Sequence, residues 1–458
     1  MGSEWKQVPI SNLADVVIGG TPSRNVPEYW NGTIPWATAR DIATTNGRYL
    51  YCTQEFITEK GLHESAAKLF PKGTIVITAR GTVGKLAQLG QDMAFNQTCY
   101  AIVPKDERLD RDFLFYALRE SIDWMRSLTY GTVFDTITTR TFEQWTIPVP
   151  PLPEQRAIAH ILGTLDDKIE LNRRMSETLE AMARALFKAW FVDFEPVRAK
   201  MEGRWVRGQS LPGLPGTGGF GTGGFGTGGF ATRPYADLFP DRLVPSELGE
   251  IPEGWEVVTL GELCYKPEYG FTASAKDQPV GPKFLRITDI NKLPWIEWES
   301  VPYCEISDSE LQQYKLHFGD ILIARMADPG HGIMVEEEVD AVFASYLIRF
   351  RPRKSYYSRY IQYWLRSDLY WEMVTARQAG TTRASLNAQE MSRLSIILPQ
   401  EPILEIFSHY IAGFRDKIIA TVRDSSALAA LRDALLPKLI RGEIRVKDAE
   451  RFLKERGL

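Results

Sequence analysis

The sequence is poor in the residues that mark secreted, metal-binding or membrane proteins. Its only cysteines in 458 residues are Cys52, Cys99, Cys264 and Cys304, without the paired spacing of a disulfide framework or a zinc knuckle. No apolar run approaches the roughly 18 residues that a membrane helix needs, and the first residues form neither a basic nor an apolar leader. We therefore expect reduced structural thiols and a cytoplasmic protein.

Net charge is also low. The chain has 54 lysines and arginines against 58 aspartates and glutamates, a formal net charge of −4. This balance excludes a polycation that coats nucleic acid indiscriminately, although it leaves room for a local basic surface. Hydrophobic residues make up 44% of the chain. At roughly 150 residues per domain, the length predicts two or three domains with substantial cores.

Catalytic motifs are scarce as well. The five histidines lack metal-ligand spacing, and His160 and His409 occupy equivalent places at the starts of two helices, where we expect a packing role. Residues 81–85 (Gly-Thr-Val-Gly-Lys) miss both the leading glycine spacing and the final hydroxyl of a phosphate loop. No Asn-Pro-Pro-Tyr type tetrapeptide is present to hold a flipped adenine. The sequence therefore favours a binding protein without a metal site over an enzyme.

What the sequence does contain is a long internal repeat. Residues 5–13 correspond to residues 255–263, residues 72–80 correspond to residues 318–325 with a slip of one residue, and the Asp-Lys-Ile of residues 167–169 recurs at 416–418. The order never changes, and the offset stays near 250 residues. So long a period indicates a duplicated domain rather than a solenoid.

Each half has the same internal pattern. Short β-branched runs such as 74–78 and 100–103 predict strands, and one amphipathic helix is expected near 113–128. A proline cluster then precedes a long helix, over 154–191 in the first half and over about 402–440 in the second. The fold class is therefore α+β. The predicted divisions are loop-rich domains at 1–150 and 251–399, long helices at 151–200 and 400–458, and a linker at 201–250.

The two long helices carry a coiled-coil seam. Stepping alternately by four and three residues from Ile158, and repeating the steps 249 residues later, gives two seams that are apolar toward their ends and polar near the middle. An antiparallel pair would bring Asn172 and Ser176 to Thr421 and Ser425, and a parallel pair in register would match the same layers. Two-fold relation of the repeats favours the antiparallel arrangement. The alternative is that each helix packs only on its own domain. The expected pairing residues are Ile158, Leu162, Leu165, Ile169, Leu179, Leu186, Phe407, Ile411, Phe414, Ile418, Leu428 and Leu435.

The segment between the halves repeats Gly-Thr-Gly-Gly-Phe three times over residues 216–230. It imitates both the dinucleotide fingerprint and the glycine loop of adenosylmethionine-dependent methyltransferases. Either motif requires a strand before it and a helix after it, whereas proline-rich sequence flanks these repeats. We interpret the segment as a flexible linker.

Several loops offer side chains suited to reading nucleic acid. Residues 349–393 contain nine basic and three acidic residues, a local charge of +6 suited to phosphate contacts, with tyrosines and tryptophans among them that largely follow helical spacing. Base reading needs polar side chains on loops that can enter a groove, although each of the following could equally be a structural turn or surface residue. The DNA-binding candidates are Thr21, Ser23, Arg24, Arg40, Arg80, Thr82, Asn96, Gln97, Thr132, Asp135, Arg286, Arg325, Thr381, Thr382, Arg383 and Asn387.

The chain resembles the specificity subunit of type I restriction-modification systems over nearly its whole length. The resemblance rests on residues 19–23 (Gly-Gly-Thr-Pro-Ser), 28–30 (Glu-Tyr-Trp), 34–36 (Ile-Pro-Trp), 95–97 (Phe-Asn-Gln), 148–156 (Pro-Val-Pro-Pro-Leu-Pro-Glu-Gln-Arg), 165–174 (Leu-Asp-Asp-Lys-Ile-Glu-Leu-Asn-Arg-Arg) and 185–188 (Ala-Leu-Phe-Lys). Residues 399–402 (Pro-Gln-Glu-Pro) depart from the fuller pattern.

This resemblance implies two pseudo-symmetric target recognition domains separated by a long antiparallel two-helix coiled coil. Each domain would read one half of a split target in double-stranded DNA. The partners implied are two modification subunits, which carry adenosylmethionine and methylate adenine, and restriction subunits, which use ATP and magnesium to translocate and cleave. The chain itself would bind no cofactor. A helix of about 35 residues spans roughly 50 Å, so two readers that far apart would leave an unread spacer between different half-sites. Alternatives from other classes are a stand-alone DNA methyltransferase and a protein scaffold without DNA binding.

Overall fold

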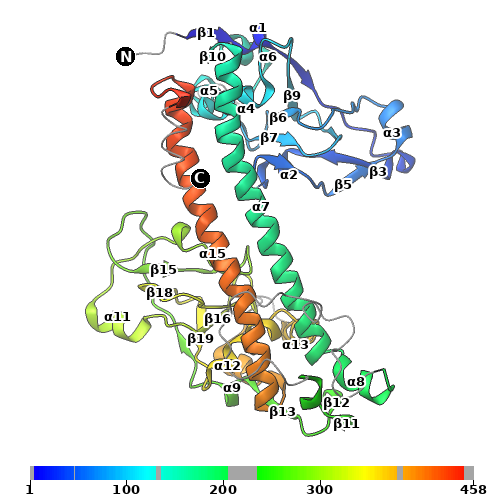
Figure 1. Ribbon diagram of the computed structural model, residues 1–458, viewed down its shortest axis with the longest axis vertical. Coiled ribbons are helices and arrows are strands. Elements are labelled where there is room, and N and C mark those ends of the chain that lie inside the picture. The colour runs from blue at the N-terminus through cyan, green and yellow to red at the C-terminus, as the bar shows by residue number, and fades with distance from the viewer. Residues whose placement is uncertain (1–4, 46, 130–135, 205–234, 379–384, 448–458) are drawn as a thin grey trace. The chain divides into compact units, whose positions relative to one another are not determined.

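The computed structural model describes residues 5–45, 47–129, 136–204, 235–378 and 385–447, and the chain divides into two compact units (Figure 1). Unit 1 comprises residues 1–172 together with residues 424–458. Unit 2 comprises residues 173–423. Each long helix therefore contributes one segment to each unit.

Unit 1 is built on small sheets. Its largest sheet has the strand order β2-β9-β6-β7-β4, antiparallel except for the parallel pair of β4 and β7. The strand β6 reads Ile-Val-Ile-Thr and is buried throughout, which is why it has no polar alternation. The strands of this unit are β1 (Lys6–Pro9), β2 (Ala14–Ile18), β3 (Trp30–Ala37), β4 (Tyr49–Leu50), β5 (Glu55–Ile57), β6 (Ile75–Thr78), β7 (Leu86–Leu89), β8 (Ala94–Phe95), β9 (Cys99–Pro104) and β10 (Thr146–Val149).

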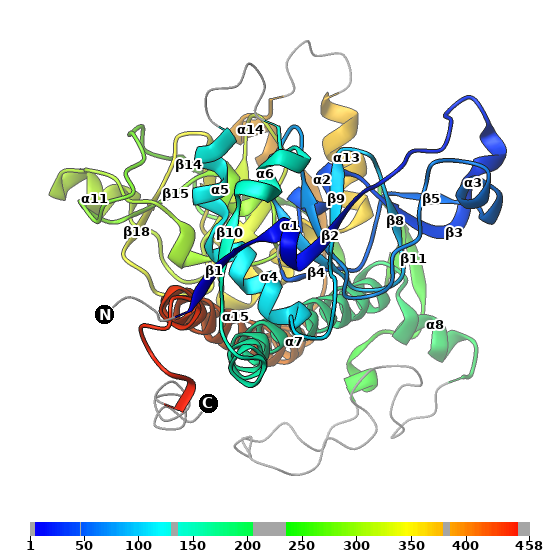
Figure 2. The ribbon, with the colours of Figure 1, turned by 90° about the horizontal axis from the view of Figure 1, so that it is seen from above.

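The helices of unit 1 are short except for the long one. They are α1 (Ile10–Leu13), η1 (Pro27–Tyr29), α2 (Ala39–Ala43), α3 (Glu59–His63), α4 (Arg111–Glu120), α5 (Ile122–Thr129) and α6 (Thr139–Gln144). The long helix α7 (Leu152–Phe191) begins here, and Figure 2 shows α4 beside it. The single helix expected near 113–128 is wrong, because the chain breaks at Ser121. The Ser121 hydroxyl donates to the carbonyl of Ala117 at 2.7 Å and accepts from the Trp145 indole at 2.8 Å, so it competes with the helical backbone.

Unit 2 repeats the same topology. The pair β13 with β20 corresponds to β1 with β10, and the sheet order β14-β19-β16-β17 corresponds to β2-β9-β6-β7. The parallel pair of β15 and β18 corresponds to β3 and β8. The strands are β11 (Leu243–Ser246), β12 (Gly249–Pro252), β13 (Glu256–Thr259), β14 (Glu268–Tyr269), β15 (Lys283–Leu285), β16 (Ile321–Ala324), β17 (Gly332–Met334), β18 (Ala341–Phe343), β19 (Leu347–Phe350) and β20 (Ser395–Leu398). The mixed helix and strand content and the repeated topology confirm the α+β class and the duplication.

The remaining helices of the chain lie wholly or partly in unit 2. They are α8 (Glu195–Met201), η2 (Tyr235–Leu238), α9 (Leu260–Leu263), α10 (Ile287–Ile290), η3 (Trp298–Ser300), α11 (Asp308–Tyr314), α12 (Ser355–Trp364), α13 (Asp368–Gln378), α14 (Ala388–Ser392) and α15 (Glu401–Ile440). Among the described residues, none of the helices combines the length and the apolarity needed to cross a membrane.

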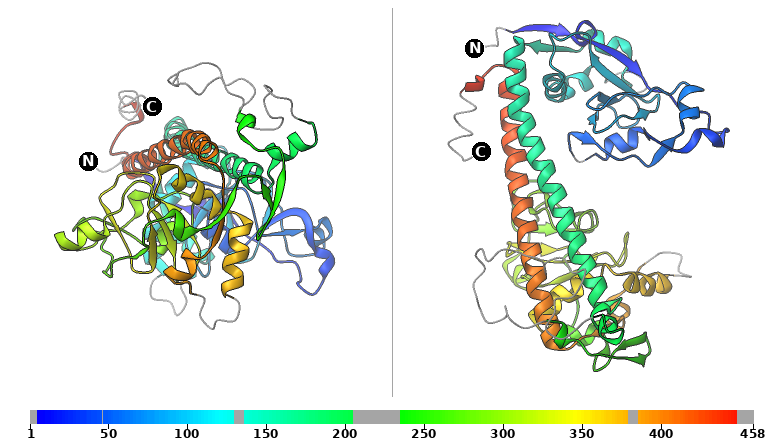
Figure 3. Two further views of the ribbon diagram at one scale, coloured as in Figure 1. Left: turned by 90° about the horizontal axis from the view of Figure 1, so that it is seen from below. Right: turned by 45° about the vertical axis from the view of Figure 1, so that its right-hand side comes forward.

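The two long helices are paired within each unit, as Figures 1 and 3 show. In unit 1, Ile158 and Leu162 of α7 share one core with Leu435 and Leu439 near the end of α15. In unit 2, the other ends of the two helices are paired, because Trp190 near the end of α7 shares a core with residues at the start of α15. The start of each helix therefore packs against the end of the other. The helices are antiparallel, as the two-fold relation of the repeats predicted.

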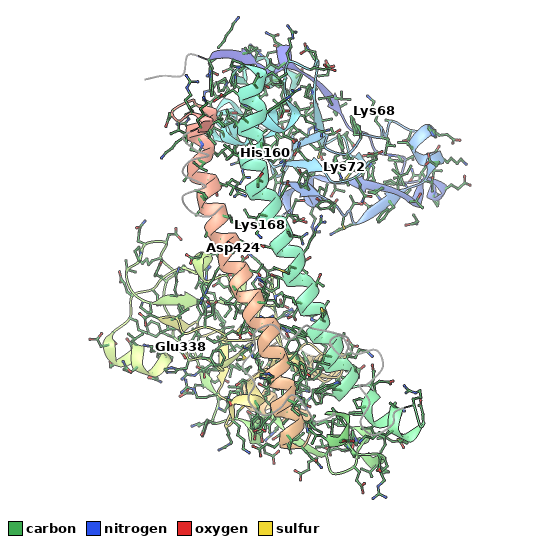
Figure 4. The ribbon with its side chains drawn as sticks, in the orientation of Figure 1. Lys68, Lys72, His160, Lys168, Glu338 and Asp424 are labelled. Carbon is green, nitrogen blue, oxygen red and sulfur yellow. The ribbon has the colours of Figure 1, made fainter. Side chains whose placement is uncertain are left out.

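The polar middle of the seam differs in detail from the prediction. Asn172 is 2% exposed and donates a 2.7 Å hydrogen bond to the carboxylate of Asp424. Asp424 lies on α15 outside the seam, as Figure 4 shows. The buried hydroxyl of Thr421 donates to the backbone carbonyl of Lys417 at 2.7 Å. The packing role expected for His160 and His409 is wrong, because both side chains are exposed.

Candidate nucleic-acid interface

In unit 1, four loops meet at one end of the largest sheet. Backbone hydrogen bonds tie them together: Gly20 donates to Phe95 at 2.9 Å, Asn96 donates to Ala37 at 3.0 Å, and Ala79 donates to Thr98 at 2.8 Å. These loops, together with the start of α2, carry the described unit 1 candidates, which are Thr21, Ser23, Arg24, Arg40, Arg80, Thr82, Asn96 and Gln97. Residues predicted separately from four parts of the sequence therefore share one surface.

The close approach of these loops depends on Gly19. A Cβ atom at this position would lie 2.4 Å from the carbonyl oxygens of both Phe95 and Asn96. No side chain can occupy that space unless the backbone moves. The glycine pair of the Gly-Gly-Thr-Pro-Ser motif thus explains how the first loop lies against the turn between β8 and β9.

The candidates in unit 1 differ in how much of each side chain is free. Arg40, Arg80, Thr82 and Gln97 are exposed. Gln97 receives a hydrogen bond from the Thr21 hydroxyl. Ser23 is also exposed, and its backbone carbonyl accepts from the Trp30 indole at 3.1 Å. A guanidinium or amide in such a position can make the bidentate contacts that read guanine or adenine.

Arg24 and Asn96 are already engaged within the protein. The Arg24 guanidinium lies 3.7 Å from the centre of the Trp30 ring and donates to both oxygens of Glu55. These hydrogen bonds raise the pKa of Arg24 and lower the pKa of Glu55. The Asn96 amide oxygen accepts from the backbone and hydroxyl of Thr98, at 3.2 and 2.6 Å, so it shapes the turn.

Some candidates lie outside the described residues, namely Thr132, Asp135, Thr381, Thr382 and Arg383. The chain that follows these segments is described. Ile137 donates to the carbonyl of Ala79 at 3.1 Å, and Leu386 donates to the carbonyl of Arg325 at 3.0 Å. In both units, the chain therefore returns to the residue that directly follows the central strand β6 or β16.

Unit 2 builds a corresponding surface with different side chains. A Cβ on Gly270 would lie 2.3 Å from the carbonyl of Ala344, so this glycine repeats the role of Gly19. Arg325 donates its backbone N–H to Tyr346 at 2.9 Å, and its guanidinium lies 5.0 Å from the centre of the Tyr269 ring. Tyr269 is 42% exposed and Tyr346 is 55% exposed. The sequence search missed both tyrosines, although the repeated glycine marks their loop.

The other two described candidates of unit 2 cap helices. Arg286 precedes α10 and donates to both oxygens of Asp289, at 2.9 and 3.0 Å. Asn387 precedes α14 and forms a capping box with Glu390, whose backbone N–H donates to the Asn387 side chain at 2.9 Å. Both remain predicted DNA contacts, with part of their hydrogen-bonding capacity already used.

The repeat register at these loops corrects one sequence-based correspondence. Gly84 donates to Thr78 and Gly330 donates to Ala324, each at 2.9 Å, so these positions are equivalent. Gly81 and Ala327 both have positive φ angles, of 79° and 62°. Arg325 therefore corresponds to Ala79. Pairing Arg325 with Arg80 is wrong by one residue, because the alignment followed the shared arginine rather than the strand register.

Part of the basic stretch at 349–393 is engaged within the protein. Four of its arginines form ion pairs within unit 2, and three of these have side chains exposed by less than a tenth. Arg349 donates to Glu268, Arg351 donates to Asp320 at 2.7 Å, Arg359 donates to Glu336, and Arg366 donates to Glu180. Most of the local charge of +6 is therefore compensated inside the protein. The aromatic residues Tyr360, Tyr363 and Trp364 are buried, as helical spacing predicted.

A buried polar contact attaches the loop-rich part of unit 1 to α7. Tyr116 and Arg119 on α4 both approach Asp166 on α7, with a 2.6 Å hydrogen bond from the tyrosine and a 3.8 Å ion pair with the arginine. Arg432 of α15 completes the contact at 2.5 Å. Burial, followed by the charge of Asp166, raises the pKa of the Tyr116 hydroxyl.

Unit 2 repeats this contact with a larger cluster. Tyr363 donates to Glu180 of α7 at 3.0 Å, and Arg366 pairs with the same carboxylate. Arg415 of α15 donates to Glu180 at 2.7 Å and to Glu336 at 2.8 Å. Burial alone would raise the pKa of Glu336, but the charge and hydrogen bonds of Arg415, assisted by Arg359 and Arg366, hold it below its ordinary value. The spacing Tyr-x-x-Arg is thus used in both units to hold α7.

The described residues contain no group of three or more histidine, cysteine, aspartate or glutamate side chains arranged to hold a metal ion. Cys99, Cys264 and Cys304 are buried free thiols, and Cys52 is an exposed free thiol. Burial raises the pKa of the Cys99 and Cys264 thiols to about 12 and that of Cys304 to about 11, so these buried thiols are poorly suited to act as nucleophiles.

Comparison with known proteins identifies the family. The model of the type I restriction modification DNA specificity domain matches residues 2–181 and matches again over residues 252–423. The chain belongs to this family. Its role is DNA sequence specificity within a restriction-modification system, and that role is recognition rather than catalysis.

Relatives cover almost the full length of the chain. The specificity subunit of the type I restriction enzyme MjaIX from Methanocaldococcus jannaschii is 29% identical over 97% of this chain and 94% of its own length. The HindI specificity subunit from Haemophilus influenzae is 25% identical over 96% of this chain and 100% of its own length. A crystal structure of the type I S subunit from M. genitalium has a TM-score of 0.55 at 14% identity, covering 95% of this chain and 96% of that chain. This last likeness supports the fold of the family.

Proposed function

We propose that the chain recognises a bipartite target in double-stranded DNA and directs adenine methylation by two modification subunits and cleavage by restriction subunits. The observation that carries the proposal is the duplicated loop surface. Each unit has one end where a glycine lets the loop after β2 or β14 approach the turn before β9 or β19. Because the same topology occurs in both units, it supports recognition of one half of the DNA target by each unit.

The two surfaces carry different side chains, which supports two different half-sites. Unit 1 offers Arg40, Arg80, Thr82 and Gln97, whereas unit 2 offers Arg325 with the exposed ring of Tyr269. Each good bidentate contact is worth roughly 1–3 kcal/mol of discrimination against the wrong base. We therefore propose that the half-sites differ in sequence and that an unread spacer separates them.

The division of labour in the proposed complex follows from the domain scheme. Target recognition domains at 1–150 and 251–399 would contact DNA, and the helical parts at 151–200 and 400–458, joined through 201–250, would serve assembly. This chain would bind no cofactor. Adenosylmethionine would be held by the modification subunits, and ATP and magnesium by the restriction subunits. Its substrate and these partners would place the complex in the cytoplasm.

Methylated-base sequencing tests the proposal directly. Genomic DNA from a host expressing the chain with its cognate modification subunits should carry methyladenine at one split motif. Replacing residues 1–150 by those of a homologue should change one half of the motif, and replacing residues 251–399 should change the other half. A motif without two separable halves, or a change of both halves by one replacement, would contradict the assignment.

A further inference from the structure

Among the described contacts, two buried ion pairs cross between the long helices, and they have the same polarity. In unit 1, Asp166 of α7 pairs with Arg432 of α15 at 2.5 Å, and their side chains are 4% and 12% exposed. In unit 2, Glu180 of α7 pairs with Arg415 of α15 at 2.7 Å, and these are 6% and 0% exposed. Both acids lie on α7 and both arginines lie on α15. The helices are therefore complementary in charge at both crossing points.

The internal repeat relates positions on α7 to positions on α15, so the charges at equivalent positions can be compared. The seams of α7 and α15 are related by an offset of 249 residues, and Asp166 plus 249 is position 415. One site of the duplicated helix thus holds an acid in the first copy and a base in the second. Arg432, the arginine of the unit 1 ion pair, corresponds to Ala183. Its charge is therefore also missing from the equivalent position of the first copy.

Substituting one helix for the other in the same register shows the consequence. If α7 of a second copy replaced α15, its Asp166 would take the place of Arg415 and face Glu180. If α15 of a second copy replaced α7, its Arg415 would take the place of Asp166 and face Arg432. Because such a pair is isologous, each contact would occur twice. Like charges buried against each other oppose association strongly.

We propose that these four residues make the pairing of the two repeats selective, so that α7 accepts α15 and rejects α7 of a second copy of this chain. Residues of the loop-rich parts do not remove the conflict. Arg119 lies 3.8 Å from Asp166, and its single guanidinium would then face two carboxylates. Tyr363, Arg366 and Glu336 of the cluster at Glu180 belong to the second repeat and would be absent from a pair of first repeats. Glu180 would keep its 3.3 Å ion pair with Arg184 of α7, but the side chain of this arginine is 54% exposed.

Pairing of two first repeats and pairing of two second repeats should be opposed to different degrees. Arg415 keeps Glu336 and Arg432 keeps Asp433 when α7 is removed, because those carboxylates belong to the same repeat as the arginines. Two copies of the second repeat would therefore meet with their arginines still partly compensated. Two copies of the first repeat would meet with Asp166 and Glu180 facing each other, and Arg119 and Arg184 would be the nearest described cations. Selectivity against pairing of first repeats should be the stronger of the two.

The experiment uses the whole folded chain with a protease site in place of residues 216–230. Two preparations with different mass tags are cut at this site, mixed, unfolded in urea and refolded, and native mass spectrometry counts the pairs that form. For the wild type, we expect pairs of one first repeat with one second repeat to exceed pairs of first repeats at least roughly 100-fold, in keeping with the effect of an unpaired buried charge. Random 1:2:1 pairing would overturn the proposal.

Two double variants separate charge selection from general weakening. Asp166→Asn with Glu180→Gln removes both cross-helix ion pairs and also removes the acid against acid contact, so pairs of first repeats should appear. Arg415→Gln with Arg432→Gln removes the same two ion pairs but leaves the acids, so pairs of first repeats should stay absent. Equal behaviour of the two variants would overturn the proposal. Should a variant fail to refold, the wild-type ratio still decides. DNA and modification subunits play no part in the test, so its outcome is independent of the proposed function.

Discussion

Tyr116 on α4 donates a 2.6 Å hydrogen bond to Asp166 on α7, and both side chains are buried. The bond joins α4, which packs on the sheet of unit 1, to the long helix α7, which continues beyond this unit. Tyr363 and Glu180 repeat the relationship in unit 2 at 3.0 Å. A hydroxyl donor that reaches a buried carboxylate fixes the angle of one helix against another, because moving either helix would leave a charge without its partner.

Tyr116→Phe should therefore destabilise unit 1. The variant leaves one oxygen of a buried carboxylate without its donor, and hydrogen bonds to charged groups contribute about 1.5–3 kcal/mol. Urea unfolding followed by circular dichroism measures the loss. The control is Tyr100→Phe, a half-buried tyrosine of the same unit for whose hydroxyl the structure describes no hydrogen bond. Equal effects of the two variants would contradict the role of the Asp166 contact.

Acid should weaken unit 2 through Glu336. The folded-state pKa of this carboxyl lies below the ordinary value of 4.5, so its contribution is fully present above that value and is lost as the pH falls through the lowered pKa. Glu336→Gln should lower stability at neutral pH and flatten the pH dependence below about 4.5. Urea unfolding at a series of pH values measures both effects.

The control for this experiment has the opposite sign. Burial raises the pKa of Glu297, so its charged form opposes folding at neutral pH and the penalty disappears as the pH falls through the raised pKa. Glu297→Gln should leave the acid loss of the wild type intact. If it abolished that loss as Glu336→Gln should, the assignment to Glu336 would be wrong.

Arg40→Ala should relax recognition in one half of the DNA target. This exposed arginine lies at the start of α2 beside the loops of unit 1, where losing a bidentate base contact would lower discrimination by about 1–3 kcal/mol. Methylated-base sequencing should then show degeneracy at one position of one half-site. Arg108→Ala is the matched control, because this exposed arginine follows the opposite end of β9. A change of motif with Arg108→Ala, or none with Arg40→Ala, would argue against this surface.

Two glycine substitutions should have opposite effects. Gly19→Ala places a Cβ 2.4 Å from two carbonyl oxygens, so the loop must move and methylation at one half-site should be lost. Gly413→Ala meets nothing within 4 Å on the exposed side of α15 and should stabilise the chain by about 0.5–1 kcal/mol, the difference in helix propensity. Unfolding curves and methylation of a target plasmid report both outcomes. A functional Gly19→Ala variant would contradict the loop packing.

Charge in the helix seam should disrupt folding in proportion to burial. Ile418 is 0% exposed, so Ile418→Asp places an unpaired carboxylate among apolar groups, at a loss of several kcal/mol. Ile169 is only partly buried, and Ile169→Asp should be milder because water can reach its carboxylate. Thermal unfolding and methylation activity rank the two variants. The reverse order would contradict the observed burial of the seam.

The long helices could be predicted well from the sequence. The expected spans, 154–191 and about 402–440, compare with Leu152–Phe191 and Glu401–Ile440. Seam positions in regular steps of four and three residues, with prolines just before each helix, specify such elements locally. The break at Ser121 could not be predicted in this way, because it depends on the Trp145 indole that contacts the serine hydroxyl from another segment.

The candidate site was predicted unevenly for a similar reason. The loops of unit 1 carry a glycine pair and polar residues that mark turns, and they do converge. In unit 2, the count of basic residues pointed to arginines such as Arg359, whose partner Glu336 lies on a different element. Whether an arginine faces solvent or a buried carboxylate is decided by tertiary contacts, which a count along the chain does not contain.

The pairing of β1 with β10 joins the first strand of the chain to the strand directly before α7, with Lys6 opposite Val149, and β13 with β20 does the same in the second repeat, with Glu256 opposite Leu398. The chain thus enters and leaves each loop-rich domain through neighbouring strands. Replacing the residues between these paired strands therefore leaves both connections of each domain at one place, next to the long helix that follows it.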